Sequence, residues 1–127
     1  MAKPDDKLIK DLQERFKFLC KDPRVLGVVL YGSFATGEYH TMSDIDICIV
    51  APHQDHYPIY KTYASGISGN IDKFDIRFFD ELPLLIRGEI IEKGILLCTK
   101  DMGELTEYYY FSTRKELADH RYRMSYI

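Results

Sequence analysis

The sequence has no long hydrophobic run. Its longest apolar stretch, residues 25–31, contains Gly27 and falls well short of the roughly 20 residues that a membrane-spanning helix needs. The N-terminal residues are charged rather than apolar, so they do not resemble a secretory signal. We therefore expect a protein with no membrane segment that stays in the cytoplasm.

Concentrations of basic residues are also missing. The chain carries 17 Lys and Arg against 20 Asp and Glu, for a net charge of −3, and no Lys/Arg run stands out. Strong binding to duplex nucleic acid depends on dense basic contacts to phosphates, so we do not expect it here. A small nucleotide is not excluded, because metal ions can neutralise its phosphates.

Cysteine is scarce. The three residues Cys20, Cys48 and Cys98 are odd in number, widely spaced and set in apolar stretches, which predicts reduced core cysteines rather than a disulfide framework. No two of them have the spacing of zinc ligands. His53 and His56 could share a metal ion, but their place in a polar loop bounded by prolines predicts that both are solvated.

Apolar periodicity predicts alternating helices and strands within a single domain spanning residues 1–127. The expected order is a helix over 6–19, a strand over 25–31, a short helical segment ending near Gly37, a strand over 45–50, loops around a short helix within 53–70, a strand over 74–79, a helix capped by Asp80 and ending before Gly94, a strand over 95–98, and a helix from Glu104 to about Met124. This alternation predicts an α/β (α+β) fold in which helices flank a sheet. Ligands of such sheets bind at the loops beyond the strand ends.

Gly32 and Ser33 follow the first buried strand. A glycine lets the chain turn sharply, so that backbone N–H groups and the Ser33 hydroxyl can approach an anion such as a phosphate. The same pair is common in ordinary turns, and that interpretation stays open.

Asp44 and Asp46 lie at the start of the alternating strand. Side chains two positions apart in a strand project from the same face, whereas Ile45 projects from the other. Two carboxylates so close repel each other unless a cation joins them, and oxygen ligands suit magnesium. A solvated pair that merely begins the strand is the alternative.

Asp75 interrupts an otherwise apolar strand whose residues Phe74 and Ile76 belong to the opposite face. A core strand seldom carries an acid without a partner for it. If this strand neighbours the one over 45–50, Asp75 can complete a cluster of three carboxylates. Asp72 is the competing candidate, although its side chain has the opposite parity.

In this order and spacing, the segments resemble the nucleotidyltransferase superfamily that includes DNA polymerase beta. They are most similar to the minimal nucleotidyltransferases (MNT) of bacteria and archaea, which carry G-S-x-A-x-G followed by S-D-x-D. The matching residues are Gly32, Ser33, Ala35, Gly37, Ser43, Asp44 and Asp46, and the resemblance covers about residues 24–98. It implies a polymerase-beta-like fold with a mixed sheet. Thr36 departs from the pattern, because small members often carry a phosphate-binding Arg there; Arg77 or Lys73 could supply that charge.

The resemblance implies transfer of a nucleoside monophosphate, with AMP from ATP favoured over other nucleotides, to an acceptor hydroxyl. It assigns two Mg²⁺ ions (or Mn²⁺ in vitro) to the catalytic residues Asp44, Asp46 and Asp75, and nucleotide phosphates to Gly32, Ser33 and Ser43.

Minimal nucleotidyltransferases resemble antitoxins of HEPN-type ribonuclease toxins, so the resemblance also implies a HEPN partner whose hydroxyl is the acceptor. Two alternatives stay open: a non-catalytic antitoxin that blocks its partner by contact, and an enzyme that modifies a small molecule such as an antibiotic. Assembly with further copies of the chain is also open. The spacing of Arg114, His120 and Tyr122 matches a HEPN motif, but a HEPN site needs a helical bundle that this segment is too short to build.

Overall fold

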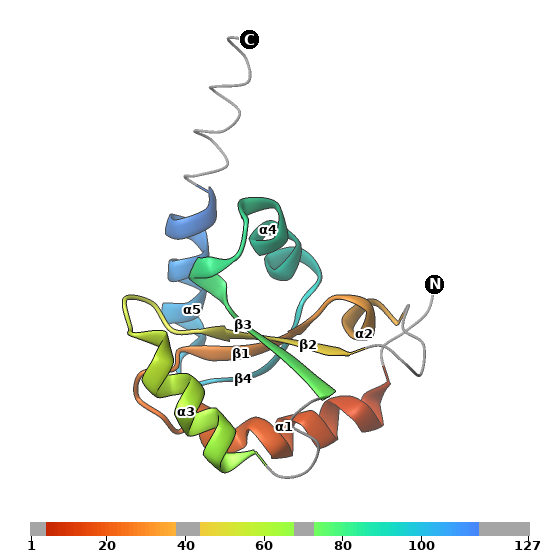
Figure 1. Ribbon diagram of the computed structural model, residues 1–127. Helices are drawn as coiled ribbons and strands as arrows, with labels where there is room; N and C mark the ends of the chain where they lie inside the picture. The colour runs from red at the N-terminus through yellow and green to blue at the C-terminus, as the bar shows by residue number, and fades with distance from the viewer. Residues whose placement is uncertain (1–4, 38–43, 68–72, 115–127) are drawn as a thin grey trace, which may run out of the picture.

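A four-stranded sheet forms the centre of the molecule, with α1 and α3 on one face and α4 and α5 on the other (Figure 1). The structure, a computed structural model, describes residues 5–37, 44–67 and 73–114. The elements are α1 (Asp6–Cys20), β1 (Gly27–Tyr31), α2 (Ser33–Thr36), β2 (Ile45–Val50), α3 (His56–Gly66), β3 (Phe74–Phe78), η2 (Phe79–Glu81), α4 (Leu84–Lys93), β4 (Ile95–Thr99), α5 (Met102–Tyr109) and the π-helical turn η3 (Tyr110–Arg114). Among these helices, none is long and apolar enough to span a membrane.

The strands lie in the order β3-β2-β1-β4. β1 pairs antiparallel with β2 and β4, whereas β2 and β3 run parallel, so the sheet is mixed as predicted. Tyr31 at the end of β1 is opposite Asp46, and Asp46 is opposite Asp75 on β3. The C-terminal end of β1 therefore lies at the same end of the sheet as the N-terminal ends of β2 and β3.

Strict alternation along β2 separates the two faces of the sheet. Ile45, Ile47 and Ile49 join the core beneath α1 and α3. Cys48 and Val50, on the other face, join the core that α4 and α5 cover. Asp46 is on this second face but stays partly exposed at the start of the strand. The predicted assignment of side chains to faces is confirmed.

Two predictions about helix ends are wrong. Asp80 does not cap α4, because η2 (Phe79–Glu81) intervenes and Pro83 occupies the N-cap position. The last helix begins earlier than predicted, at Met102, where the Asp101 carboxylate accepts a hydrogen bond from the Glu104 backbone N–H at 3.1 Å. The predicted continuation to Met124 lies outside the described residues.

The prediction of three reduced cysteines is wrong for two of them. Cys20 at the end of α1 and Cys98 on β4 form a disulfide, with their Cα atoms 6.1 Å apart. Their separation of 78 residues along the chain gave no sign of this pairing, which arises because α1 packs across β4. Cys48 is buried and reduced, as expected.

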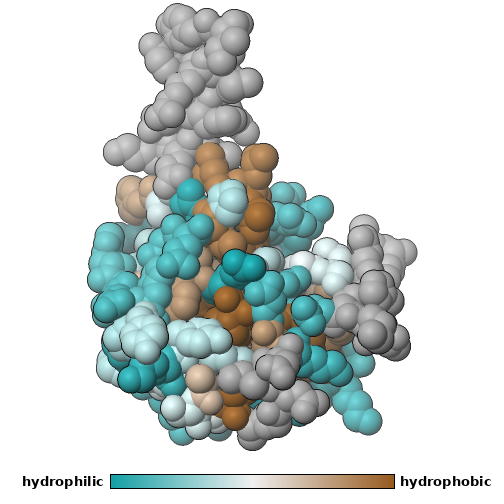
Figure 2. Space-filling view, viewed as in Figure 1, coloured by the Kyte–Doolittle hydropathy of each residue, from teal (hydrophilic) through white to brown (hydrophobic). Residues whose placement is uncertain are grey.

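Several large apolar side chains remain exposed on α4. Leu85 is 75% exposed, and Ile86 and Ile91 are also exposed, while Ile90 alone among the isoleucines of this helix is buried. Figure 2 shows hydrophobic surface in the upper part of the view, in the region of α4.

Candidate active site

The parallel pairing of β2 and β3 places Asp46 directly beside Asp75. The two side chains are close enough for the charge of Asp75 to act on the Asp46 carboxyl group. The expectation that Asp75 lies on a strand next to Asp46 is therefore confirmed. Asp44 lies just before β2 and is exposed, but its charge also acts on Asp46. The competing residue Asp72 lies outside the described residues.

Asp46 is held in an environment that disfavours its ionised form. Burial is the main cause that raises the pKa of its carboxyl group, and the negative charges of Asp75 and Asp44 raise it further. The guanidinium of Arg77 acts in the opposite direction and partly offsets them. Carboxylates that repel one another in this way bind a cation favourably, because a cation removes the repulsion.

Arg77 belongs to the same cluster. Its Nε–H donates to Oδ1 of Asp75 at 3.1 Å, and its side chain is 60% exposed. Arg77 follows Asp75 by two positions in β3, so both side chains project from one face of the sheet. Of the two residues considered as substitutes for an arginine at Thr36, Arg77 is the one beside the carboxylates.

The turn after β1 lies against Asp46. Gly32 adopts φ 75° and ψ −151°, a backbone conformation that is essentially restricted to glycine. A Cβ atom at this position would overlap Oδ2 of Asp46. The predicted role of Gly32 in a sharp turn is thus confirmed, and the turn also has to pass closely by a carboxylate.

The short helix α2 (Ser33–Thr36) follows this turn, and Gly37 caps its C-terminal end with φ 79°. The Thr36 hydroxyl donates weakly to the Ser33 carbonyl at 3.3 Å, so it turns back onto its own helix. Ser43, the remaining predicted phosphate ligand, lies outside the described residues. The structure therefore places Gly32 against Asp46, with Ser33 next along the chain at the start of α2, and the phosphate-binding roles of Ser33 and Ser43 remain predictions.

Tyr31 is a member of this site that the sequence interpretation missed. It is half-buried opposite Asp46, and burial followed by the charge of Asp46 raises the pKa of its hydroxyl. The signal was present in the sequence, since Tyr31 immediately precedes the Gly-Ser turn and ends the strand beside the acidic one. Its hydroxyl stays protonated at neutral pH and can donate a hydrogen bond.

The donor set suits a hard divalent cation. Asp46 and Asp75 offer carboxylate oxygens, which magnesium prefers, and their mutual repulsion favours a bound cation. Within residues 5–37, 44–67 and 73–114, however, no group of three or more His, Cys, Asp or Glu side chains is arranged to hold a metal ion. The structure thus brings together a carboxylate pair with Asp44 nearby, and the three-ligand set remains a prediction.

Comparison with known families supports the same interpretation. Residues 13–103 match the family described as polymerase beta, nucleotidyltransferase. The chain belongs to this family. A putative protein adenylyltransferase of Methanocaldococcus jannaschii is 41% identical over 87 residues, covering 68% of this chain and 66% of that protein, so the match spans a little under two thirds of the relative's length.

Solved structures show the same nucleotidyltransferase fold. A toxin–antitoxin complex with AMP-PNP contains a chain with a TM-score of 0.60 and 22% identity, over 88% of this chain and 94% of that one. A chain in the complex of the tri-AMPylated HEPN toxin of Shewanella oneidensis with MNT antitoxin has a TM-score of 0.58 and 18% identity. The match covers 91% of this chain and 94% of that one. A putative nucleotidyltransferase of Sulfolobus solfataricus has a TM-score of 0.52 and 20% identity, over 76% of this chain and 84% of that one.

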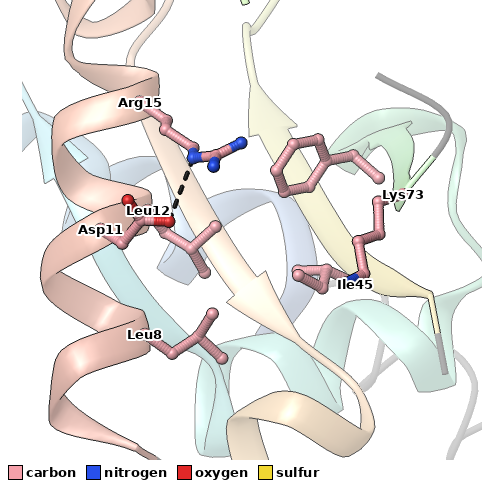
Figure 3. A pocket seen from close by; sticks show the side chains of 7 residues that line it. Leu8, Asp11, Leu12, Arg15, Ile45 and Lys73 are labelled. Atoms are coloured by element: carbon pink, nitrogen blue, oxygen red, sulfur yellow. Dashed lines mark ion pairs between the residues drawn. The ribbon is translucent and has the colours of Figure 1, made fainter. Parts of the chain in front are cut away.

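This nucleotidyltransferase domain has a separate cavity of about 160 Å³ between α1 and the starts of β2 and β3 (Figure 3). Ile45 and Phe74 line it, and both belong to the face opposite Asp46 and Asp75. The ion pair between Arg15 Nε and Asp11 Oδ2, at 3.0 Å, borders it from α1, and Lys73, the residue before β3, borders it from the other side. Lys73 is therefore directed to this cavity and not to the carboxylates.

The prediction of solvated histidines holds for His53, which is exposed, but not for His56. The His56 ring stacks on Phe78 with centroids 4.1 Å apart, and its Nδ1 lies 2.7 Å from Oε1 of Glu81. Because His56 opens a helix of 11 residues rather than sitting in a loop, its side chain packs against the end of β3. It does not reach the carboxylate pair.

Proposed function

We propose that this chain transfers AMP from ATP to a hydroxyl group of a partner protein. The observation that carries the proposal is the parallel register that aligns Asp46 with Asp75, together with the Gly32 turn that passes against Asp46. Acidic oxygens and a glycine turn are thereby brought to the same end of the strands. Nucleotidyl transfer needs such an arrangement, because its transition state carries spread negative charge between an attacking and a departing oxygen.

Asp46, Asp75 and Asp44 would hold two Mg²⁺ ions. Bound there, Mg²⁺ supplies positive charge to the phosphates and lowers the pKa of the acceptor hydroxyl. The backbone at Gly32 and the Ser33 hydroxyl bind the phosphates at the end of β1, with Ser43 as a further ligand. Asp75 accepts the proton of the acceptor hydroxyl, whose oxygen forms a bond to the α-phosphorus while the bond to the β-phosphate oxygen breaks and pyrophosphate leaves. Arg77 holds the Asp75 carboxylate in place through its 3.1 Å hydrogen bond.

The relatives support the choice of nucleotide and acceptor. The relative with 41% identity is named a putative protein adenylyltransferase, and structural neighbours include a toxin–antitoxin complex with AMP-PNP and a tri-AMPylated HEPN toxin bound to MNT antitoxin. We therefore propose a HEPN-type protein as partner and acceptor, ATP as nucleotide and an antitoxin role in the cytoplasm.

The test uses ATP labelled at the α-phosphate, MgCl₂ and the protein encoded by the neighbouring gene, which the proposal expects to be of HEPN type. With the wild-type chain and ATP labelled at the α-phosphate, we expect the partner protein to become labelled. We expect no labelled partner when the ATP is labelled at the γ-phosphate instead, and none when Asp46→Asn replaces the wild type. Glu89→Gln, an exposed change on α4, serves as the matched control and should transfer normally. A wild-type chain that binds the partner tightly but transfers no label would show a non-catalytic antitoxin instead.

A further inference from the structure

A pocket of about 240 Å³ opens at the end of the sheet opposite the carboxylates. Leu26 and Pro52 lie at its base, where the Leu26 backbone N–H donates to the Val50 carbonyl at 2.7 Å just before β1 begins and as β2 ends. The carboxylate pair lies at the start of β2. About four strand residues separate the two ends, which corresponds to roughly 13 Å, so this pocket is distinct from the candidate active site.

One face of α5 and the turn that follows it forms the wall of the pocket. Glu104, Glu107, Tyr108 and Phe111 are spaced by three and four residues, so their side chains share this face. Leu105, on a different face, is buried against the sheet and anchors the helix. Phe111 is 62% exposed and therefore adds little to the core. The pocket face combines aromatic surface with two carboxylates.

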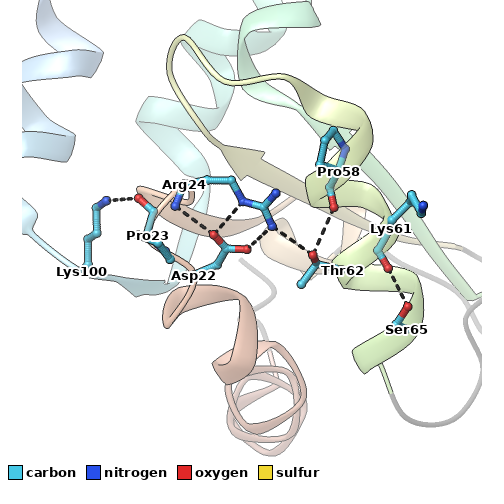
Figure 4. A network of polar contacts seen from close by, with 8 residues as sticks. All are labelled: Asp22, Pro23, Arg24, Pro58, Lys61, Thr62, Ser65 and Lys100. Carbon is cyan, nitrogen blue, oxygen red and sulfur yellow. Dashed lines mark hydrogen bonds and ion pairs between the residues drawn. The ribbon is translucent and has the colours of Figure 1, made fainter.

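The two carboxylates have no cationic partner among the side chains that the structure describes: none of the salt bridges found there includes Glu104 or Glu107. His53 also lines the pocket, and no salt bridge joins it to either carboxylate among the described side chains. Two further basic groups at this end of the sheet, Lys100 and Arg24, are engaged elsewhere (Figure 4). Lys100 Nζ donates to the Pro23 carbonyl at 2.6 Å, and Arg24 Nη2 contacts Asp22 at 2.6 Å and donates to Thr62 Oγ1 at 3.0 Å.

Helix stability accounts for only one of these carboxylates. Glu104 lies in the first turn of α5, where a negative charge interacts favourably with the helix dipole. Glu107 lies beyond that turn and gains little from it. An acid placed next to an exposed phenylalanine is instead well suited to a ligand that is both apolar and positively charged.

We propose that this pocket binds an arginine side chain of a partner protein. The methylene stem of arginine would pack on Tyr108 and Phe111, and its planar guanidinium would lie against an aromatic face. The fork of N–H donors would meet the carboxylates of Glu104 and Glu107 in charge-assisted hydrogen bonds. This docking contact does not depend on nucleotidyl transfer, because it lies at the other end of the sheet.

The test is an NMR titration of the uniformly ¹⁵N-labelled full chain with the capped peptide acetyl-Leu-Arg-Leu-amide. The comparison peptide carries citrulline, which has the same shape as arginine but no charge. We expect the arginine peptide to shift the amide signals of Glu107, Tyr108 and Phe111 with a Kd of about 1 mM, and the citrulline peptide to bind at least about tenfold more weakly.

The double variant Glu104→Gln, Glu107→Gln should reduce binding of the arginine peptide to the level of the citrulline peptide. The matched double variant Glu89→Gln, Glu92→Gln on α4 removes the same charge and should bind like the wild type. Phe111→Ala, an exposed position, gives a second variant that does not depend on charge and should also weaken binding. Equal binding of the two peptides, shifts that map elsewhere, or no shift at ten times the expected Kd would each overturn the proposal.

Discussion

The substitution Gly32→Ala tests the link between the turn after β1 and the carboxylate of Asp46. An alanine at this position would have to keep φ near 75° and ψ near −151°, and its Cβ would overlap Oδ2 of Asp46. Either the backbone rotates away from this conformation or the Asp46 side chain moves. Both responses displace the carboxylate relative to Asp75.

The expected losses of stability and of transfer rate follow from the strained backbone and from the displaced carboxylate, respectively. A non-glycine residue held in this backbone region costs about 1–3 kcal/mol. For a chain of this length, about 4 °C of melting temperature is lost per kcal/mol, so we expect Tm to fall by about 4–12 °C. Moving a catalytic group by about 1 Å can cost about 100-fold in rate, which sets the expected loss of nucleotidyl transfer.

Label transfer from α-labelled ATP and thermal unfolding measure the two consequences in the same preparation. Gly88→Ala is the matched control, because a Cβ at Gly88 in α4 would meet no atom within 4 Å. That control should keep full activity and gain about 0.5–1 kcal/mol from helix propensity. If Gly32→Ala lost stability as predicted but transferred AMP within about twofold of the wild type, the proposed dependence of Asp46 on this turn would be refuted.

Three further predictions concern charge, covalent structure and nucleotide affinity. Asp46→Asn should abolish transfer yet raise the free energy of unfolding at pH 7. Because the pKa of Asp46 is raised in the folded protein, ionising this carboxyl group destabilises the fold. This destabilisation is absent below the pKa of an unfolded aspartate and grows as the pH rises through the folded pKa. Urea titrations should therefore show that the variant is more stable than the wild type at pH 7 but not at acid pH. Cys98→Ser removes the disulfide that closes a loop of 78 residues and should lower the free energy of unfolding by about 4 kcal/mol. Adding reductant to the wild type should lower it by the same amount. An effect of reductant on the stability of the variant would contradict this explanation. Thr36→Arg should tighten ATP binding about tenfold by calorimetry, and unchanged affinity would argue against a phosphate contact there.

The sequence allowed β2 and its two faces to be predicted correctly, because strict alternation leaves few other interpretations. Ile45–Val50 matches the predicted bounds, and Asp75 pairs with Asp46, so the two strands are neighbours as the predicted cluster required. The need for glycine at position 32 was also predictable, and Gly32 adopts a positive φ. In each case a local rule of backbone geometry was decisive.

Features that depend on tertiary contacts were not predictable in the same way. The disulfide joins Cys20 to Cys98 because α1 crosses β4, and no local pattern encodes that crossing. His56 was expected in solvent, but it stacks on Phe78 because α3 packs against the end of β3. Tyr31 gained its place beside the carboxylates from the antiparallel register with β2.

The register of the carboxylate pair is itself maintained by the apolar side of the sheet. A shift of one residue between β2 and β3 would turn Asp75 to the opposite face, since successive side chains alternate. Such a shift would also remove Phe74 and Ile76 from the core beneath α1 and α3, where Phe74 packs edge-on against Phe16 with centroids 5.2 Å apart. The burial of these side chains therefore opposes the repulsion between Asp46 and Asp75, and it keeps the two acids paired even when no cation joins them.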